Sequence, residues 1–218
     1  MYHWNFEFLW GFRKLLFMGL GYTAAYTVIC TVLGLAIGLA VAMGRLSRPI
    51  WLRAPLRAYV EVFRCTPVLV QLVWFYYALP VILNIQVPAV VAATLVLSLY
   101  TAAFYAEIFR GGIVSIERGQ WDAARALGLR WGPMMRRVVL PQAVRRMVPP
   151  FLNQSIIQLK NTSLVSTIAV PDLLYQGTLI TSDTYKPLEV YTVVALIYFA
   201  LLFPATRLVQ WLEGRGVR

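Results

Sequence analysis

Three stretches of this chain carry no charged side chain, and their length limits what the chain can fold into. They cover residues 15–44, 65–106 and 190–206. About 20 consecutive apolar residues allow a helix to cross the hydrocarbon core of a bilayer. Over the whole chain 60% of the residues are hydrophobic and 13% are charged, whereas about 25% are charged in soluble domains. We therefore expect an all-α integral membrane protein.

The uncharged runs and the breaks between them predict five membrane-spanning helices. Residues 65–106 hold two of them, because prolines, Asn84 and Gln86 interrupt the run at 80–88. The first of these two helices is long enough to cross the membrane only if it begins before residue 65 and includes Glu61 and Arg64. These two residues are three apart and can form an ion pair on a helix. The predicted spans are about 23–43, 61–79, 88–109, 148–169 and 190–206, with a loop at 45–57 and a polar connector at 171–189.

The first uncharged run has two interpretations, a signal peptide or a retained membrane helix. Arg13 and Lys14 precede the run, as basic residues precede the apolar region of a signal peptide. That apolar region, however, is only about 7–15 residues long. The greater length favours a retained helix. Gly34, Gly38 and Ala42 recur every four residues along it. Such a stripe of small residues lets another helix approach closely, so we expect a packing face there.

The distribution of charge predicts how the chain is oriented. Four arginines lie in residues 45–57 and eight in 110–146, whereas 80–88 has no charge and 171–189 has one lysine and three acidic residues. Because Lys and Arg accumulate on the cytoplasmic side, we expect the arginine-rich loops and the C-terminus in the cytoplasm and the N-terminus outside. Arg13 and Lys14 conflict mildly with this orientation. The membrane thus explains the net charge of +11, and no nucleic-acid partner is expected.

Several chemistries are excluded by what the chain lacks. It has one histidine, His3, and two cysteines, Cys30 and Cys65, which lie in apolar runs. This excludes most histidine-based metal sites, Ser-His or Cys-His catalysis and a disulfide framework. The sequence has neither a G-x-x-x-x-G-K-[ST] phosphate-binding loop nor an H-E-x-x-H motif. We therefore expect no enzyme activity and no nucleotide or metal cofactor in this chain.

The most polar part of the chain is the insert at 110–146, and it predicts a short helix. Ser115 is a candidate N-cap, Asp122 lies early and Arg125 late, which suits the helix dipole. Gly128 is a natural C-cap. The helix should run from about Gln120 to Leu127. A short helix with small side chains can enter a groove on a partner protein. It can equally be a loop helix that lies on the membrane, and these residues alone leave both interpretations open.

A resemblance favours the first interpretation. D-A-A-x-x-L-G at 122–128, followed by R-x-V-L-P, resembles the EAA loop of permeases of ATP-binding-cassette (ABC) importers. FYAEIFRGGIVSIERGQ at 104–120, CTPVLVQ at 65–71, LPQA at 140–143 and LKNTSLVS at 159–166 resemble the polar amino-acid branch of that family. The likeness extends from about residue 19 to 204, the core of a single permease domain at 1–218. Two departures are Cys65 where the family usually has Gly, and Asp122 in place of Glu.

The resemblance implies a function and a set of partners. The short helix between the third and fourth spans would be the coupling helix, docked on a separate cytoplasmic P-loop ATPase that holds ATP and Mg²⁺. Family permeases work in pairs, as two copies or two related chains, in the lipid of the bacterial inner membrane. A periplasmic binding protein delivers the amino acid. The residues that would couple to the ATPase are Gly119, Gln120, Asp122, Ala123, Ala124, Ala126, Leu127 and Gly128.

Polar side chains inside the predicted spans are candidates for contact with the solute. Such groups are costly in a membrane and face the bundle interior or a cavity. Amide and hydroxyl groups can hydrogen-bond both the carboxylate and the ammonium of an amino acid. An equally good interpretation of each residue is a hydrogen bond between helices. The candidates are Gln71, Ser98, Thr101, Gln154, Gln158, Asn161 and Ser163.

Lys160 lies deep in the predicted fourth span, where it can pair with a carboxylate of the solute or of a neighbour such as Glu107. A lysine is common at this place in the family motif, so the resemblance favours a structural role. This span contains no acidic residue. A pocket that selects a cationic solute would be expected to have one. The sequence therefore favours a neutral or acidic amino acid over a cationic one.

Two further functions compete with an ABC permease. A secondary transporter often shows inverted repeats and intramembrane acids. This chain shows no internal repeat, five spans do not divide into halves, and such acids are sparse. A permease-like regulatory subunit without transport of its own is compatible with the sequence.

Overall fold

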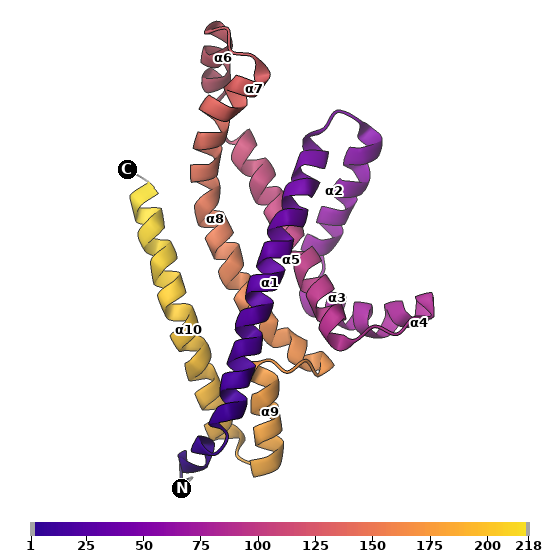
Figure 1. Cartoon of the computed structure of the whole chain (residues 1–218), viewed down its shortest axis with the longest axis vertical. Helices are drawn as coiled ribbons and strands as arrows, with labels where there is room; N and C mark the ends of the chain where they lie inside the picture. Colours follow the sequence, from indigo (N-terminus) through magenta and orange to yellow (C-terminus); the bar gives the residue numbers. More distant parts are fainter. Residues whose placement is uncertain (1–2, 217–218) are drawn as a thin grey trace.

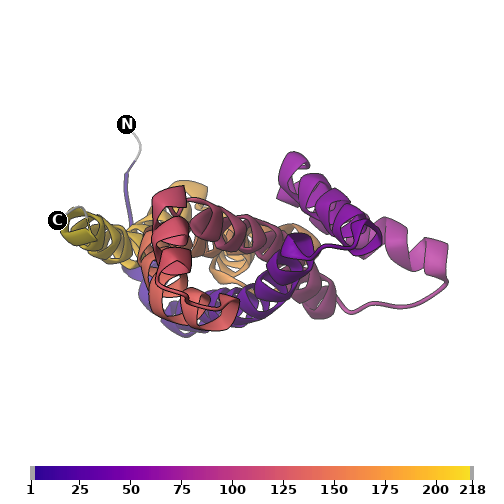
Figure 2. The same cartoon turned by 90° about the horizontal axis from the view of Figure 1, so that it is seen from above.

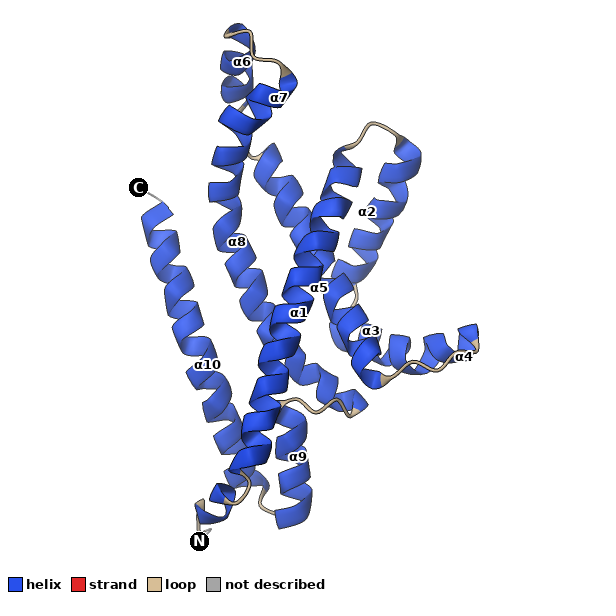
Figure 3. Ribbon diagram, viewed as in Figure 1, coloured by secondary structure: helices blue, strands red, loops and turns tan. Residues whose placement is uncertain are grey.

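The computed structural model describes residues 3–216 of the chain, with side chains described up to residue 212. No β-strand occurs within that range, which confirms the all-α prediction (Figure 3). Short 3-10 turns lie at Glu7–Trp10 and Thr162–Ile168, and π-helical turns at Trp74–Ala78 and Met135–Val139. The helices are α1 (Arg13–Leu46), α2 (Ile50–Cys65), α3 (Val68–Val73), α4 (Leu79–Leu83), α5 (Ala89–Val114), α6 (Arg118–Ala126), α7 (Trp131–Met134), α8 (Leu140–Asn161), α9 (Leu173–Thr184) and α10 (Pro187–Gly216).

The long helices run lengthwise, and short elements gather at the two ends of the molecule. Helices α6 and α7 and the end of α10 lie at one end, whereas α9 and the N-terminal segment lie at the other (Figure 1). Three helices are long and apolar enough to cross a membrane: Arg13–Leu46, Ala89–Val114 and Pro187–Leu212. A fourth span results if α2 and the segment Val68–Leu83 are counted together. Helix α8 does not qualify by composition.

The predicted packing face on α1 lies against α5, in the largest helix–helix contact of the chain. A Cβ atom added at Gly34 would lie 3.0 Å from Thr101 Cγ2. One added at Gly38 would lie 2.8 Å from the Cβ of Tyr105. Neither glycine therefore leaves room for a side chain, and Ala42 is buried on the same face. The stripe of small residues thus allows the close approach of two helices, as predicted.

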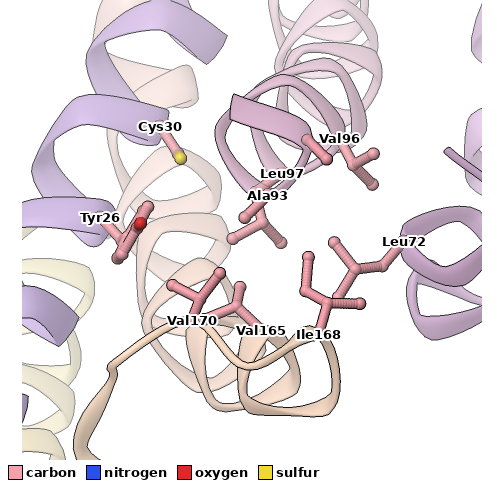
Figure 4. Close-up of a cluster of buried hydrophobic side chains, with 10 residues drawn as sticks. Tyr26, Cys30, Leu72, Ala93, Val96, Leu97, Val165, Ile168 and Val170 are labelled. Atoms are coloured by element: carbon pink, nitrogen blue, oxygen red, sulfur yellow. The ribbon is translucent and has the colours of Figure 1, made fainter. Parts of the chain in front are cut away.

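A buried hydrophobic cluster joins four parts of the chain (Figure 4). Cys30 of α1 lies in it beside Leu97 of α5, together with Leu72 of α3 and Ile168 of the 3-10 turn that follows α8. Each of these side chains is at most 2% exposed. The cluster fixes the junction between α3, α5 and the end of α8.

The prediction of a loop at 45–57 was wrong over most of its length. Only the turn between α1 and α2 is non-helical, and α2 begins at Ile50 with Pro55 inside it. A proline within a helix costs about 3 kcal/mol. Burial offsets this cost, because Val60 of α2 is fully buried against α1 and α5, with Leu56, Tyr59 and Phe63 packed around it. Glu61 approaches Arg57 at 4.0 Å, so the predicted pair with Arg64 was wrong as well.

The chain bends sharply at Pro67, within the predicted second span. The two segments Ile50–Cys65 and Val68–Leu83 meet at 109°. A residue before proline prefers extended backbone, and Thr66 has ψ 139°. Gln71 stabilises the bend, because its Nε2 donates to the carbonyls of Phe63 and Thr66, each at 3.0 Å. As a result, the segment from α2 to α4 projects to one side of the other helices (Figure 2).

The predicted fourth span starts and ends earlier than expected. Helix α8 contains Pro149 and Pro150, and it gives way to a 3-10 turn after Asn161. The last helix also begins earlier than predicted, at Pro187.

The prediction of a polar connector at 171–189 was wrong, because α9 occupies most of it. Asp172 is the N-cap of this helix, and its carboxylate accepts from the backbone N–H groups of Leu174 and Tyr175. The hydroxyl of Tyr198 on α10 also donates to Asp172, at 3.3 Å, and Thr23 of α1 accepts from the N–H of Leu173. These contacts join α1, α9 and α10 at one end of the molecule.

Burial raises the pKa of the Asp172 carboxyl from 3.8 to about 6, although its hydrogen bonds act in the opposite direction. The folded state therefore binds a proton more tightly than the unfolded state, and stability falls as pH rises from about 4 to about 6. We expect Asp172→Asn, which keeps a capping side chain, to be more stable than wild type at pH 7.5. The gain should be on the order of 2 kcal/mol.

Melting curves in detergent at several pH values would check this expectation. The advantage of Asp172→Asn should shrink towards pH 4 and vanish below the unfolded-state pKa of 3.8, where the wild-type carboxyl is protonated in both states. Asp183→Asn, on the exposed side of α9, is the matched control and should change little at any pH. A wild type that is more stable than Asp172→Asn at pH 7.5 would contradict the assignment of burial as the dominant effect.

Candidate functional site

Helix α6 is the predicted short helix of the polar insert. It runs from Arg118 to Ala126, two residues earlier at its start than expected. Gly128 follows in the left-handed conformation with φ +72°, where glycine is favoured, and its N–H donates to the carbonyl of Arg125. The predicted capping by Ser115 was wrong, because the N-cap is Glu117 and Ser115 Oγ donates to the carbonyl of Gly112 instead.

The predicted coupling residues separate into two faces of α6. Ala124 is 2% exposed and packs in a cluster with Ile116, Met134 and Met147. It anchors the helix and cannot touch a partner. The other residues of the set are exposed: Gly119, Gln120, Asp122, Ala123, Ala126, Leu127 and Gly128. Leu127 is 80% exposed, which is unusual for leucine at the end of a polar helix. The outward face of α6 therefore presents small side chains and Leu127 to solvent, whereas Gln120 and Asp122 on it contact Gln142 and Arg125 of the same chain.

Helix α6 is tied to the long helices beneath it. Nε2 of Gln142, on α8, donates to Oε1 of Gln120 at 3.1 Å. Arg146 of α8 donates to the carbonyl of Ser115, and Trp121 Nε1 donates to that of Ile116. Helix α6 is therefore attached to α8 and to the residues that follow α5.

The predicted solute-contact residues do not all come together. Thr101 of α5 donates to Oε1 of Gln158 on α8 at 2.5 Å, and both side chains are fully buried. Gln154 is 5% and Ser98 is 2% exposed. Among the residues that the structure describes, the Nε2 groups of Gln154 and Gln158 have no hydrogen-bond partner. We call these four buried residues the polar seam, in which the Thr101–Gln158 hydrogen bond joins α5 to α8.

Gln71 lies apart from this seam, at the bend after α2. Both hydrogens of its amide group are donated to backbone carbonyls. Stabilising the bend therefore accounts for a buried polar side chain at this position without contact with a solute. Nothing in the sequence around Gln71 distinguishes it from the seam residues, since all are amides or hydroxyls within apolar runs.

The end of α8 carries the more accessible candidates. Lys160 is exposed, and Asn161 and Ser163 are partly exposed. Ser163 Oγ donates to the carbonyl of Lys160 at 2.8 Å. The expected pairing of Lys160 with Glu107 was wrong, because Glu107 binds Arg45 at 2.7 Å and also Arg110. The Lys160 ammonium group is thus available to a solute or to another chain.

Comparison with known families decides the class of this protein. The family described as "binding-protein-dependent transport system inner membrane component" matches residues 34–217. The chain belongs to this family. It is therefore the transmembrane permease subunit of an ABC importer, and a transport component rather than an enzyme.

Named relatives agree with this placement. The permease is 38% identical over 186 residues to the octopine transport system permease protein OccM of Rhizobium meliloti. The alignment covers 79% of this chain and 74% of the relative. It is also 38% identical over 158 residues to the glutamine transport system permease protein GlnP of Escherichia coli K12, covering 72% of each chain.

Solved structures give the same result for the fold. The permease superposes on a chain of an amino acid ABC transporter crystallised with histidines, with a TM-score of 0.93 and 33% identity. That match covers 98% of this chain and 100% of the other. A chain of the MetNI methionine ABC transporter, in an inward-facing conformation, matches at a TM-score of 0.69 and 23% identity over 93% of this chain, a likeness of fold alone.

Proposed function

We propose that this permease moves an amino acid across the bacterial inner membrane, and that ATP is hydrolysed on a separate P-loop ATPase docked at α6. The observation that carries the proposal is the outward face of α6. This face is exposed, while hydrogen bonds from α8 hold the helix and the residues that follow α5 in place. ATP and Mg²⁺ then belong to the partner chain. A periplasmic binding protein delivers the amino acid, as the family description implies.

The proposed topology has five spans, with the N-terminus outside and the C-terminus in the cytoplasm. The spans are α1, the bent segment from α2 to α4, α5, α8 and α10. Support comes from Figure 1, where α6 and the end of α10 both lie on the side of the molecule away from the N-terminal segment. The proline and amide residues of α8 suit a span that is covered by protein rather than by lipid.

The proposed assembly contains a second permease, either another copy or a related chain. The projecting α3–α4 segment exposes Val81, Ile82 and Leu83 by 55–80%. Either lipid or a second permease covers these side chains, and the pairing of permeases implied by the family favours the second permease. The choice between identical and related chains is not encoded in these residues.

The solute is proposed to be a neutral or acidic amino acid that reaches the end of α8. Lys160 supplies a positive charge, and Asn161 and Ser163 supply an amide and a hydroxyl. In the buried polar seam the Thr101–Gln158 hydrogen bond joins α5 to α8, and the unpartnered Nε2 groups of Gln154 and Gln158 become available if these helices separate. Solutes named for relatives, octopine and glutamine, both carry a carboxylate.

Co-purification tests the partner. The C-terminally tagged permease would be extracted from native membranes in mild detergent, beside Asp122→Lys and Leu127→Asp. We expect a P-loop ATPase with the wild type and its loss in both variants. The control is the double variant Arg136→Gln/Arg137→Gln, which changes two exposed residues elsewhere in the 110–146 insert. It should still co-purify with the ATPase. No ATPase with the wild type in any detergent would refute the docking role of α6.

Uptake into proteoliposomes that contain the purified transporter and its binding protein tests the solute. We expect uptake of glutamine or glutamate to exceed that of lysine or arginine, and Lys160→Met to lower uptake about tenfold or more. Lys14→Met, which also removes an exposed lysine, is the control. Higher affinity for lysine or arginine would contradict the proposed solute class.

A further inference from the structure

A cavity of about 770 Å³ lies between α2 and the ends of α1 and α5, away from both α6 and the polar seam. Its lining is strongly basic. Five arginines contribute to it: Arg45, Arg53, Arg57, Arg64 and Arg110. Two glutamates, Glu61 and Glu107, also line it. The formal charge of the lining is therefore +3, from five positive and two negative groups. Neither the transport path proposed above nor the ATPase contact uses these residues.

One side of the cavity is a fixed ion-pair cluster. Glu107 of α5 accepts from Arg45 NH1 at 2.7 Å and from Arg110 Nε at 3.0 Å. The side chain of Arg45 is only 9% exposed. One carboxylate shared by two guanidinium groups leaves a net charge of +1 at the base of the cavity. This cluster therefore attracts an anion and does not neutralise the site.

The other side of the cavity is formed by arginines along one face of α2. Arg53 and Arg57 are four residues apart, and Arg64 follows seven residues after Arg57, so all three lie on one helical face. Arg53 has no ion-pair partner among residues 3–212. Arg57 is 4.0 Å from Glu61, and both side chains are more than half exposed, so the attraction between them is weak. Guanidinium donors are thus free for an anion.

The surroundings of the cavity favour a lipid over a soluble anion. Trp51 is 73% and Ile50 is 62% exposed at the start of α2, beside the arginines. Tryptophan is enriched at the boundary between headgroups and acyl chains. Helix α2 is amphipathic, with arginines on one face and apolar side chains such as Val62, 60% exposed, elsewhere. An anion with acyl chains contacts both surfaces, whereas free phosphate contacts only the arginines.

We propose that this cavity binds the phosphate headgroup of an anionic phospholipid, from the leaflet on the side of α6. Arginine forms paired hydrogen bonds with phosphate oxygens. Basic pockets between membrane helices on the cytoplasmic side commonly bind anionic headgroups. The lipid bridges α2 to α1 and α5, and so fixes the base of the projecting segment from α2 to α4 (Figures 1 and 2).

Native mass spectrometry of the intact transporter, titrated with phosphatidylglycerol or with phosphatidylcholine, tests the proposal. Both lipids carry one phosphate, but only the first has a net negative charge. We expect phosphatidylglycerol to bind at least tenfold more tightly, and Arg53→Gln/Arg57→Gln to remove this preference, because each charge near the surface contributes roughly fivefold. Both arginines are exposed, so the variant should keep the wild-type melting temperature. Arg136→Gln/Arg137→Gln removes the same charge outside the cavity and should keep the preference.

Three results would overturn the proposal. The first is an unchanged lipid preference in Arg53→Gln/Arg57→Gln. The second is complete displacement of phosphatidylglycerol by millimolar inorganic phosphate, which would identify a soluble-anion site. The third is equal binding of the two lipids by the wild type, as expected if a second permease copy covers the cavity. The assay reads lipid binding and not ATP hydrolysis or uptake, so its failure is distinguishable from failure of the coupling role of α6.

Discussion

Arginine in place of Ala123 is expected to reduce amino-acid uptake by at least tenfold without unfolding the permease. Ala123 lies on the outward face of α6 and is exposed, so substitution there should change stability by less than about 0.5 kcal/mol. If α6 docks on an ATPase as proposed, a long charged side chain in place of the Ala123 methyl group would obstruct that contact and bring a charge into it. Uptake into proteoliposomes, with the melting temperature measured on the same preparation, would check both expectations.

The neighbouring Ala124 provides the matched comparison. It faces the opposite way, 2% exposed among Ile116, Met134 and Met147. Ala124→Arg would bury a charge without a partner, which costs several kcal/mol, so the melting temperature should fall together with uptake. The two adjacent alanines thus separate docking from folding. Wild-type uptake by Ala123→Arg would show that the outward face of α6 does not transmit the force.

The sequence predicts most of the long helices because their signal is local. An uncharged run such as 15–44 has few structural alternatives to a helix in a membrane, and α1, α5 and α10 follow these runs closely. The short helix α6 is also locally specified, since Gly128 supplies the left-handed residue that ends it. The positions of these helices are thus predicted, although α1 begins ten residues before the predicted span 23–43 and α10 continues ten residues beyond 190–206.

Helix α2 could not be predicted because its stability comes from contacts distant in sequence. Its prolines and arginines are typical of a loop, and only the burial of Val60 against α1 and α5 makes a helix favourable there. Helix α9 was missed for a related reason. Its polar residues suggest a connector, but the buried cap Asp172 and the contacts with Thr23 and Tyr198 stabilise it.

In the candidate site, too, the sequence predicts what depends on local spacing and misses what depends on contacts distant in sequence. Helical spacing places Gln154 and Gln158 on one face, and both are buried. Spacing cannot show that Thr101, 57 residues away, occupies the Oε1 of Gln158, or that the amide of Gln71 is used by the bend at Pro67. Which polar group is free depends on the partner that the fold brings to it.

Leucine in place of Gly38 is expected to abolish most of the folded permease. A Cβ atom at this position would lie 2.8 Å from the Cβ of Tyr105 and 2.9 Å from the carbonyl oxygen of Ala102. The second of these is helix backbone, which cannot rotate away as a side chain can. Helices α1 and α5 would have to separate, and the loss should exceed the roughly 1–3 kcal/mol typical of overpacking. The yield of monodisperse protein on size exclusion, and its melting temperature, would measure the loss.

Gly21 distinguishes this steric effect from a general intolerance of leucine in α1. It lies on the same helix, but a Cβ atom there would meet nothing within 4 Å. Because leucine is the better helix former by about 0.8 kcal/mol, Gly21→Leu should fold at least as well as the wild type. If both variants fold equally well, the close contact between α1 and α5 is not what holds them together. If only Gly38→Leu fails, the stripe of small residues on α1 is required for the close packing of α1 against α5.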